Sequence, residues 1–192
     1  MNKLISKHFE EHRSVYDKTC HFGESVEKIA NFLIDCLKKN GTIFWCGNGG
    51  SASDSQHLAG ELVGRFEGNR KPLKSLALNA DSAVMTCIIN DFGYEQVFAR
   101  QIKALGSKED VLVGISTSGN SKNIIEAFKQ ANQMGIVTIG LLGKKGGDAS
   151  KIVKQSVIIP SDSTARIQEM HILIGHILCD LIEEELNLKN KK

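Results

Sequence analysis

Short, continuously apolar runs alternate with longer amphipathic segments, and this alternation restricts the fold more than any other feature of the chain. The apolar runs lie at residues 42–46, 75–79, 110–115, 136–142 and 156–160. They lack polar alternation, which is typical of strands covered on both faces. Helix-like segments lie between them, near residues 51–66, 82–104, 120–134 and 146–154. The pattern predicts an α/β fold, a doubly wound five-stranded parallel sheet with helices on both faces.

Two further helical segments flank this pattern. Residues 1–40 hold two amphipathic stretches that break around Cys20–Gly23, which predicts an N-terminal helical hairpin. Such a hairpin is expected either to serve in oligomerisation or to cover one face of the sheet. Residues 164–186 predict one long last helix. We therefore expect a single domain over residues 1–192, with the hairpin followed by an α/β core at 41–192.

Charge and cysteine usage exclude several classes of function. A net charge of +2, without a dense basic stripe, gives no reason to expect nucleic acid binding. The five cysteines are odd in number and none stands in C-x-x-C spacing, which favours buried thiols in a reducing compartment. The start of the chain turns polar too soon for a signal peptide, and no apolar stretch is long enough to span a membrane. The sequence thus predicts a cytoplasmic protein without a membrane partner.

A glycine turn, CGNGGSA at residues 46–52, follows the first predicted strand. Gly47, Gly49 and Ala52 fit the permissive dinucleotide pattern G-x-G-x-x-G/A, which is weak evidence by itself. That pattern also requires an acidic residue about 20 positions on, at the end of the second strand. Glu67 has this spacing but precedes the second strand. A turn that brings backbone donors near an anionic or polyol ligand is the simpler interpretation.

A hydroxyl-rich loop, GISTSGNS at residues 114–121, follows the third predicted strand. It has both glycines and the final serine of the P-loop G-x-x-x-x-G-K-[ST], but Asn120 replaces the lysine. Triphosphate chemistry is therefore not expected. The hydroxyls of Ser116, Thr117, Ser118 and Ser121 beside a helix amino terminus suit one phosphate monoester. A helix N-cap is the alternative, but a cap needs only one such residue.

Polar side chains that could take part in catalysis or bind a metal lie on two predicted helices and in one turn. His57 and Glu61 are four positions apart, on one helix face, where they could share a ligand or form a surface pair. Gln168 and His176 are eight positions apart and face the same side of the last helix. Asp91, in a polar NDFG turn at residues 90–93, is expected to cap the next helix. Spacing alone leaves open whether these elements converge.

Five separated segments together resemble a known family. They are CGNGGS at residues 46–51, QHLAGE at 56–61, NDFG at 90–93, GISTSGNS at 114–121 and RIQEMHILIGH at 166–176. In this order they resemble the phosphoheptose isomerases, a branch of the sugar isomerase (SIS) fold with flavodoxin-like topology. The resemblance runs over essentially the whole chain. One local departure is Ala165, where some relatives carry an aspartate.

The resemblance implies an activity, a cofactor and an assembly. The activity is conversion of sedoheptulose 7-phosphate to glycero-manno-heptose 7-phosphate, the first step towards nucleotide-activated heptose for lipopolysaccharide or another surface glycan. The assembly is a homotetramer with active sites at subunit interfaces and one zinc ion per subunit. The implied zinc ligands are His57, Glu61, Gln168 and His176. The implied substrate contacts are Asn48, Gly49, Gly50, Ser51, Glu61, Asn90, Asp91, Ser116, Thr117, Ser118, Ser121 and Gln168.

Aldose–ketose interconversion requires groups that this set contains. The reaction moves a proton between two adjacent carbons through an enediol, which needs a base, an acid and stabilisation of negative charge. Glu61 is the expected base and His176 the expected acid, with zinc as a possible Lewis acid. A carboxylate held by zinc is a poorer base, so the two functions of Glu61 compete. A phosphate held by the hydroxyl loop would keep the substrate in register.

Two functions of other classes remain open. Closely similar SIS proteins regulate bacterial replication initiation by binding protein, and in them the positions matching Glu61 and His176 resemble non-catalytic Ser and Asn. This chain retains both titratable groups, which favours the enzyme. A sugar-phosphate sensor with the same phosphate site and no turnover is the second alternative.

Overall fold

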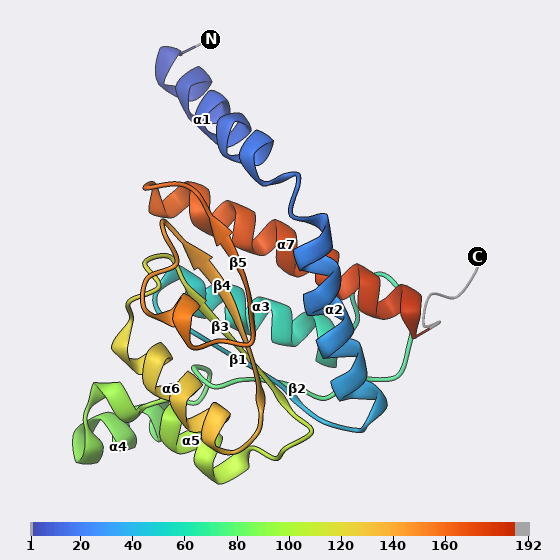
Figure 1. Cartoon of the computed structure of the whole chain (residues 1–192), viewed down its shortest axis with the longest axis vertical. Helices are drawn as coiled ribbons and strands as arrows, with labels where there is room; N and C mark the ends of the chain where they lie inside the picture. The colour runs from blue at the N-terminus through green and yellow to red at the C-terminus, as the bar shows by residue number, and fades with distance from the viewer. Residues whose placement is uncertain (1, 187–192) are drawn as a thin grey trace.

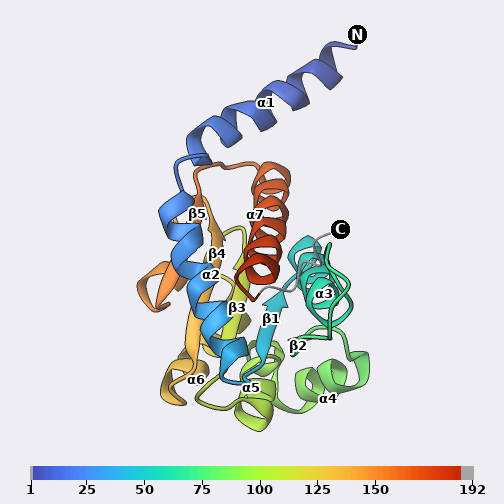
Figure 2. The ribbon, with the colours of Figure 1, turned by 90° about the vertical axis from the view of Figure 1, so that its right-hand side faces the viewer.

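The computed structural model describes residues 2–186 and confirms a five-stranded parallel sheet with helices on both faces (Figures 1 and 2). The strands are β1 (Ile43–Gly47), β2 (Ser75–Ala77), β3 (Val111–Ser116), β4 (Val137–Gly143) and β5 (Gln155–Ile159). The α-helices are α1 (Lys3–Thr19), α2 (Gly23–Lys38), α3 (Gly50–Val63), α4 (Ser82–Phe92), α5 (Ala99–Leu105), α6 (Lys122–Gln133) and α7 (Thr164–Glu185). Two short 3₁₀ segments are η1 (Tyr94–Gln96) and η2 (Ala149–Lys151). The extreme ends of the predicted domain 1–192 lie outside the described residues.

The strand order β2-β1-β3-β4-β5 is that of a doubly wound, flavodoxin-like sheet. The chain runs outward in one direction from β1 to β2, and then crosses back to β3 on the other side of β1. This reversal makes the β1–β3 junction the topological switch point. Ligands of open α/β sheets bind at such a point, beyond the carboxyl ends of the strands.

Both faces of the sheet are buried, which explains the unbroken apolar runs. Along β1, Trp45 belongs to the hydrophobic cluster that α2, α3 and α7 complete, whereas Phe44 and Cys46 belong to the cluster that α5 and α6 complete. Alternate side chains of one strand thus enter opposite cores. All five residues of β1 and all six of β3 are buried. These strands therefore form the rigid centre on which the loops at their ends are held.

The two N-terminal helices are present, and the chain breaks between them as predicted. α2 packs on the sheet through Ile29 and Leu33, both fully buried. α1, in contrast, projects away from the body rather than lying along α2, so the pair differs from the predicted hairpin (Figures 1 and 2). The reason is that the apolar face of α2 packs against the sheet, so little apolar surface of α2 remains for contact with α1. Within α1 only Val15 and Thr19 are buried.

Two predicted helices differ from the structure, and glycines account for both. The segment 82–104 is not one helix: α4 ends at Gly93, and η1 and α5 follow. Glycine is the residue that most often ends helices. The segment 146–154 contains only the three-residue η2. It begins with Gly146 and Gly147, which disfavour a helix because ordering glycine costs more backbone entropy than ordering other residues.

All five cysteines are free, and Cys36, Cys46 and Cys179 are buried, as expected. Burial is the main reason why the pKa of the Cys179 thiol is raised to about 12, so that this thiol stays protonated. Among the described residues, no helix has the length and apolar character that crossing a membrane would require.

Candidate functional site

The two loops singled out in the sequence lie side by side at the switch point. β1 and β3 are paired in parallel, with Gly47 opposite Ile115. The glycine turn after β1 and the hydroxyl loop after β3 therefore leave the same edge of the sheet next to each other. Each loop leads directly into a helix, α3 and α6 respectively. Helix amino termini present free N–H groups and a partial positive charge, so this edge favours an anion.

Three hydroxyls of the loop, those of Ser116, Ser118 and Ser121, form a cluster. The Oγ atoms of Ser116 and Ser121 are 3.0 Å apart, and those of Ser116 and Ser118 are 3.5 Å apart. The backbone N–H of Gly119 donates to Ser116 Oγ over 3.1 Å. Ser121 occupies the N-cap position of α6, but its side chain makes no capping hydrogen bond. The N-cap interpretation therefore does not account for Ser121, and the hydroxyls converge on one another instead.

Asn48, in the glycine turn, is fixed by two residues that the sequence did not single out. Its amide exchanges two hydrogen bonds with the amide of Asn123 on α6, at 3.0 and 2.9 Å. The hydroxyl of Tyr94 donates to Asn48 Oδ1 over 2.7 Å. Asn123 is fully buried, a position where an amide needs partners. Asn123 lies two positions after the loop motif, whereas nothing in the sequence connected Tyr94 with it.

Gln168 of α7 lies at the start of α3. A Cβ atom on Gly50 would come within 2.3 Å of Gln168 Nε2, so only glycine permits this approach. The close contact groups Gln168 with the glycine turn, where the resemblance implies substrate contacts. His57 is seven residues further along α3, which is about 10 Å along the helix axis. Gln168 as a zinc ligand therefore stays a prediction, and its side chain is directed to the other end of α3.

The remaining three predicted metal ligands come together. His57 Nε2 is 2.9 Å from His176 Nε2 and 3.3 Å from Glu61 Oε1. All three ligand atoms lie within 4.8 Å of one another. Two ligands of one tetrahedral zinc ion, each about 2.1 Å from the metal, are roughly 3.4 Å apart. The spacing and the donor set of two histidines and a glutamate therefore fit a catalytic metal centre that keeps an open position.

A further side chain, Phe66, lies beside these three groups, and the sequence analysis did not identify it. Its ring stacks on the imidazole of His176, with centroids 5.6 Å apart and planes inclined by 28°. The rings of His57 and His176 meet edge to face, with centroids 5.1 Å apart. Phe66 belongs to the loop after α3, so α3 and α7 supply His57, Glu61 and His176, and this loop supplies the ring that lies on His176.

Asn90 and Asp91 are exposed in the last turn of α4. Asn90 Nδ2 donates to Asp91 Oδ1 over 2.8 Å, and the following η1 has no side-chain cap. The expected capping by Asp91 is thus not observed, and a substrate contact by either residue stays a prediction. Glu67 precedes β2 instead of ending it, so it does not occupy the ribose-binding position of a dinucleotide fold.

Comparison with known proteins bears on this arrangement. The model of the SIS domain family matches residues 9–143. A phosphoheptose isomerase of Helicobacter pylori is 49% identical over 99% of this chain and 100% of its own length, and one of Campylobacter jejuni is 48% identical over 96% and 99%. The chain belongs to the phosphoheptose isomerase family. Among solved structures, the phosphoheptose isomerase of Neisseria gonorrhoeae is 40% identical, with a TM-score of 0.90 over 95% of this chain and 98% of its own.

A second phosphoheptose isomerase structure, from Francisella tularensis, is 36% identical, with a TM-score of 0.91 over 96% of this chain and all of its own. The likeness to these two structures thus extends over nearly the whole chain. The resemblance predicted from the five motifs is confirmed.

Proposed function

We propose that this chain is a phosphoheptose isomerase, which interconverts sedoheptulose 7-phosphate and glycero-manno-heptose 7-phosphate. The observation that carries the proposal is the meeting of His57, Glu61 and His176 in a chain of this family, since these groups lie on elements far apart in the sequence. Acid, base and metal-ligand chemistry become available together only where such side chains converge. In this reading the product serves the synthesis of an activated heptose for lipopolysaccharide or another surface glycan.

The hydroxyl cluster is the proposed phosphate site. Ser116, Thr117, Ser118 and Ser121 lie beside the amino terminus of α6, and Asn48, Gly49, Gly50, Ser51 and Gln168 lie around the adjoining turn. Hydroxyls and backbone N–H groups bind a dianion without needing a lysine. Because the phosphate is remote from the reacting carbons, its binding orients the substrate and leaves proton transfer to other groups.

Glu61 is the proposed base and His176 the proposed acid. The carboxylate takes the proton from one of the two adjacent carbons and returns it to the other, through an enediol. Oε1 of Glu61 faces His57, so Oε2 is the oxygen available for this transfer. His176 supplies and withdraws the proton on the substrate oxygen. The ring of Phe66 covers one side of this imidazole.

Zinc is the proposed cofactor, held by His57, Glu61 and His176 and, as the resemblance implies, Gln168. When bound, the metal would polarise the oxygen atoms of the substrate as a Lewis acid. Within one chain, Gln168 is directed to Gly50. Gln168 as the fourth ligand therefore rests on the resemblance alone.

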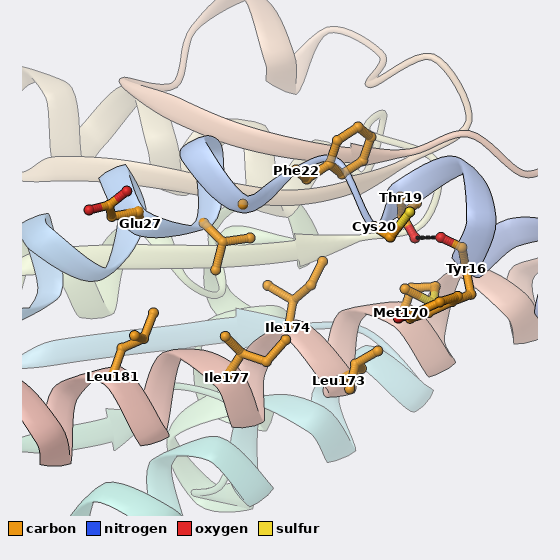
Figure 3. Close-up of a pocket in the computed structure, with 12 residues that line it drawn as sticks. Tyr16, Thr19, Cys20, Phe22, Glu27, Met170, Leu173, Ile174, Ile177 and Leu181 are labelled. Carbon is orange, nitrogen blue, oxygen red and sulfur yellow. Dashed lines mark hydrogen bonds between the residues drawn. The ribbon is translucent and has the colours of Figure 1, made fainter.

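Assembly into a homotetramer is supported by unpaired apolar surface. A groove of about 500 Å³ runs between α2 and α7, and Figure 3 shows the α7 side chains that face α2 across it. Its lining includes Tyr16, Phe22, Val26, Met170, Leu173, Ile174, Ile177 and Leu181. The projecting α1 exposes Leu4, Ile5 and Phe9. Apolar patches of this kind mark interaction surfaces, and a second copy of this chain offers the matching helices.

A coupled assay tests the proposed activity. The unmodified protein, supplied with zinc and sedoheptulose 7-phosphate, is expected to form heptose 7-phosphate, measured by a kinase specific for that product. The absence of product at any zinc concentration would overturn the isomerase. Sugar-phosphate binding without turnover would then favour a sensor, and the lack of both would favour a protein-binding regulator.

A further inference from the structure

A buried ion pair joins α7, which carries His176, to the loop after α3, which follows His57 and Glu61. Glu183 of α7 and Arg70 of the loop after α3 are 2.7 Å apart, and their side chains are 0% and 1% exposed. Glu183 also accepts hydrogen bonds from the backbone N–H groups of Phe66, Glu67 and Gly68, at 3.1, 3.1 and 2.7 Å. One carboxylate thus accepts hydrogen bonds from the backbone N–H groups of all three residues in the turn 66–68.

Arg70 connects the same ion pair to the carboxyl end of α3. Its Nη2 donates to the backbone carbonyl of Glu61 over 2.8 Å, and its Nη1 donates to that of Leu62 over 2.9 Å. These carbonyls belong to the last turn of α3, where no intrahelical donor remains for them. A guanidinium is well suited to this position because its fixed fork bonds several oxygens at once. The backbone that carries Glu61 is therefore tied to Glu183.

Glu183 also lies in line with His176. The two residues are seven positions apart on α7, which places them about 20° apart around the helix axis. The turn that Glu183 holds includes Phe66, whose ring lies on His176. One buried carboxylate thereby fixes the position of the base through Arg70 and the orientation of the acid through Phe66.

We propose that Glu183 and Arg70 are positioning residues that hold Glu61 and His176 in the geometry for zinc binding and proton transfer. This inference rests on the proposed isomerase site. Stability alone is a weak explanation of the pair, because replacing a buried ion pair by apolar residues is often neutral for stability. Groups that orient metal ligands, in contrast, commonly control both metal affinity and activity.

The test uses two kinds of variant in the full chain. Glu183→Gln with Arg70→Met removes both charges together, so that no buried charge is left unpaired. Phe66→Leu leaves the ion pair intact and removes only the ring from His176. For each variant, zinc affinity is measured by competition with a chromogenic chelator, and kcat and KM are measured with sedoheptulose 7-phosphate. Thermal unfolding establishes that the variant is folded.

Each variant is expected to bind zinc about 10- to 100-fold more weakly and to lose kcat by a similar factor. KM is expected to stay within about twofold, because the hydroxyl cluster lies on other elements. The matched control is Glu185→Gln, two positions further on α7, whose exposed carboxylate pairs with Lys38 at 3.2 Å. This control is expected to behave like the unmodified protein in both measurements.

Zinc affinity and kcat within twofold of the unmodified protein, in a folded double variant, would overturn the inference and assign the pair a purely structural role. If the double variant does not fold, unchanged zinc affinity and kcat in Phe66→Leu overturn it. Failure of the unmodified protein to bind zinc also overturns it. An unmodified protein that binds zinc but forms no product refutes the proposed activity, and the zinc measurements still decide the positioning.

Discussion

Glu61 and His176 both lie beside His57, the one at the end of α3 and the other on α7. Glu61 is partly buried at the end of α3, and His176 is covered on one side by Phe66. Each could be read alone as an ordinary surface group. Their distances to His57 place three ligand-type atoms around one point, where a carboxylate and an imidazole can act on the same substrate.

Replacing Glu61 by Gln is expected to lower kcat by about 100- to 10,000-fold, the usual contribution of a general base. The amide keeps the shape of the side chain but cannot accept the proton, so KM should change little. Steady-state kinetics with saturating zinc measures this effect. Glu24→Gln, an exposed change on α2 that removes one pair with Lys28, is the matched control and should keep full activity. A Glu61→Gln enzyme within tenfold of normal kcat would contradict Glu61 as the base.

At the scale of elements, the proposed phosphate site depends on packing between two loops. Gly119 has φ of +67°, and a Cβ atom there would lie 2.0 Å from the carbonyl oxygen of Gly146. Asn120 Oδ1 accepts the backbone N–H of Asp148 over 2.9 Å. The loop after β4 therefore supports the hydroxyl loop after β3, and both must move if Gly119 gains a side chain.

Gly119→Ala is expected to raise KM for the sugar phosphate at least tenfold, because the clash displaces the hydroxyls that hold the phosphate. Gly135→Ala is the matched control: its φ is +72°, yet its nearest neighbour would be Lys108 Cγ at 3.6 Å. Both variants should lose about 1–2 kcal/mol of stability from the left-handed backbone, and Gly119→Ala should lose more because of its clash with Gly146. Kinetics together with urea unfolding separates the two effects. An equal KM in both variants would show that the loop tolerates the clash.

At the scale of the whole molecule, several apolar side chains of α1 stay exposed within the described part of the chain. Phe9 is 69% exposed and Leu4 is 59% exposed, on a helix that stands away from the body (Figure 2). His12 Nδ1 lies 2.7 Å from Glu169 Oε2, which ties α1 to α7 by a polar contact. The direction of α1 therefore favours contact with other copies rather than with its own sheet.

Phe9→Glu is expected to weaken assembly, because it places a charge in the proposed interface. Light scattering over a range of protein concentrations should show a smaller mean mass than for the unmodified protein. Lys7→Gln alters charge by the same amount at a side chain that is 67% exposed, and it should leave the mass unchanged. Equal masses for all three proteins would place the interface elsewhere.

The pH dependence of stability is another property of the folded molecule, and His171 is expected to dominate it between pH 7 and pH 4. Burial lowers the pKa of His171 to about 4 from 6.5, although its hydrogen bond to the carbonyl of Leu142 opposes this shift. The unfolded chain therefore takes up a proton near pH 6.5 that the folded chain refuses. Stability is full above pH 6.5 and falls with decreasing pH, by about 3 kcal/mol at pH 4.

Urea unfolding at pH 7.5, 5.5 and 4.5 measures this loss. His171→Gln can keep a donor for the Leu142 carbonyl and does not titrate, so its stability should depend less on pH over this range. Glu183 affects stability at lower pH. Burial raises the pKa of its carboxyl group, but hydrogen bonds from the Gly68 N–H, Arg70 and the neighbouring N–H groups outweigh burial and bring the pKa below 4.5. Its contribution is present above pH 4.5 and is lost as the pH falls through the lower value. The same dependence of stability on pH in His171→Gln and in the unmodified protein would contradict the assignment of this loss to His171.

The sequence by itself determined the alternation of strands and helices, the positions of the glycine turn and the hydroxyl loop, and the family. These are local signals, because an apolar run or a turn pattern is contained in neighbouring residues. Only the tertiary structure decided the direction of α1, the meeting of His57 with His176 across 119 positions, and the enclosure of Glu183 and Arg70. The spacing of residues along one helix determines which of them share a face. It does not determine which part of another helix that face contacts. Gln168 and His176 share one side of α7, and yet the packing of α7 along α3 directs them to opposite ends of that helix.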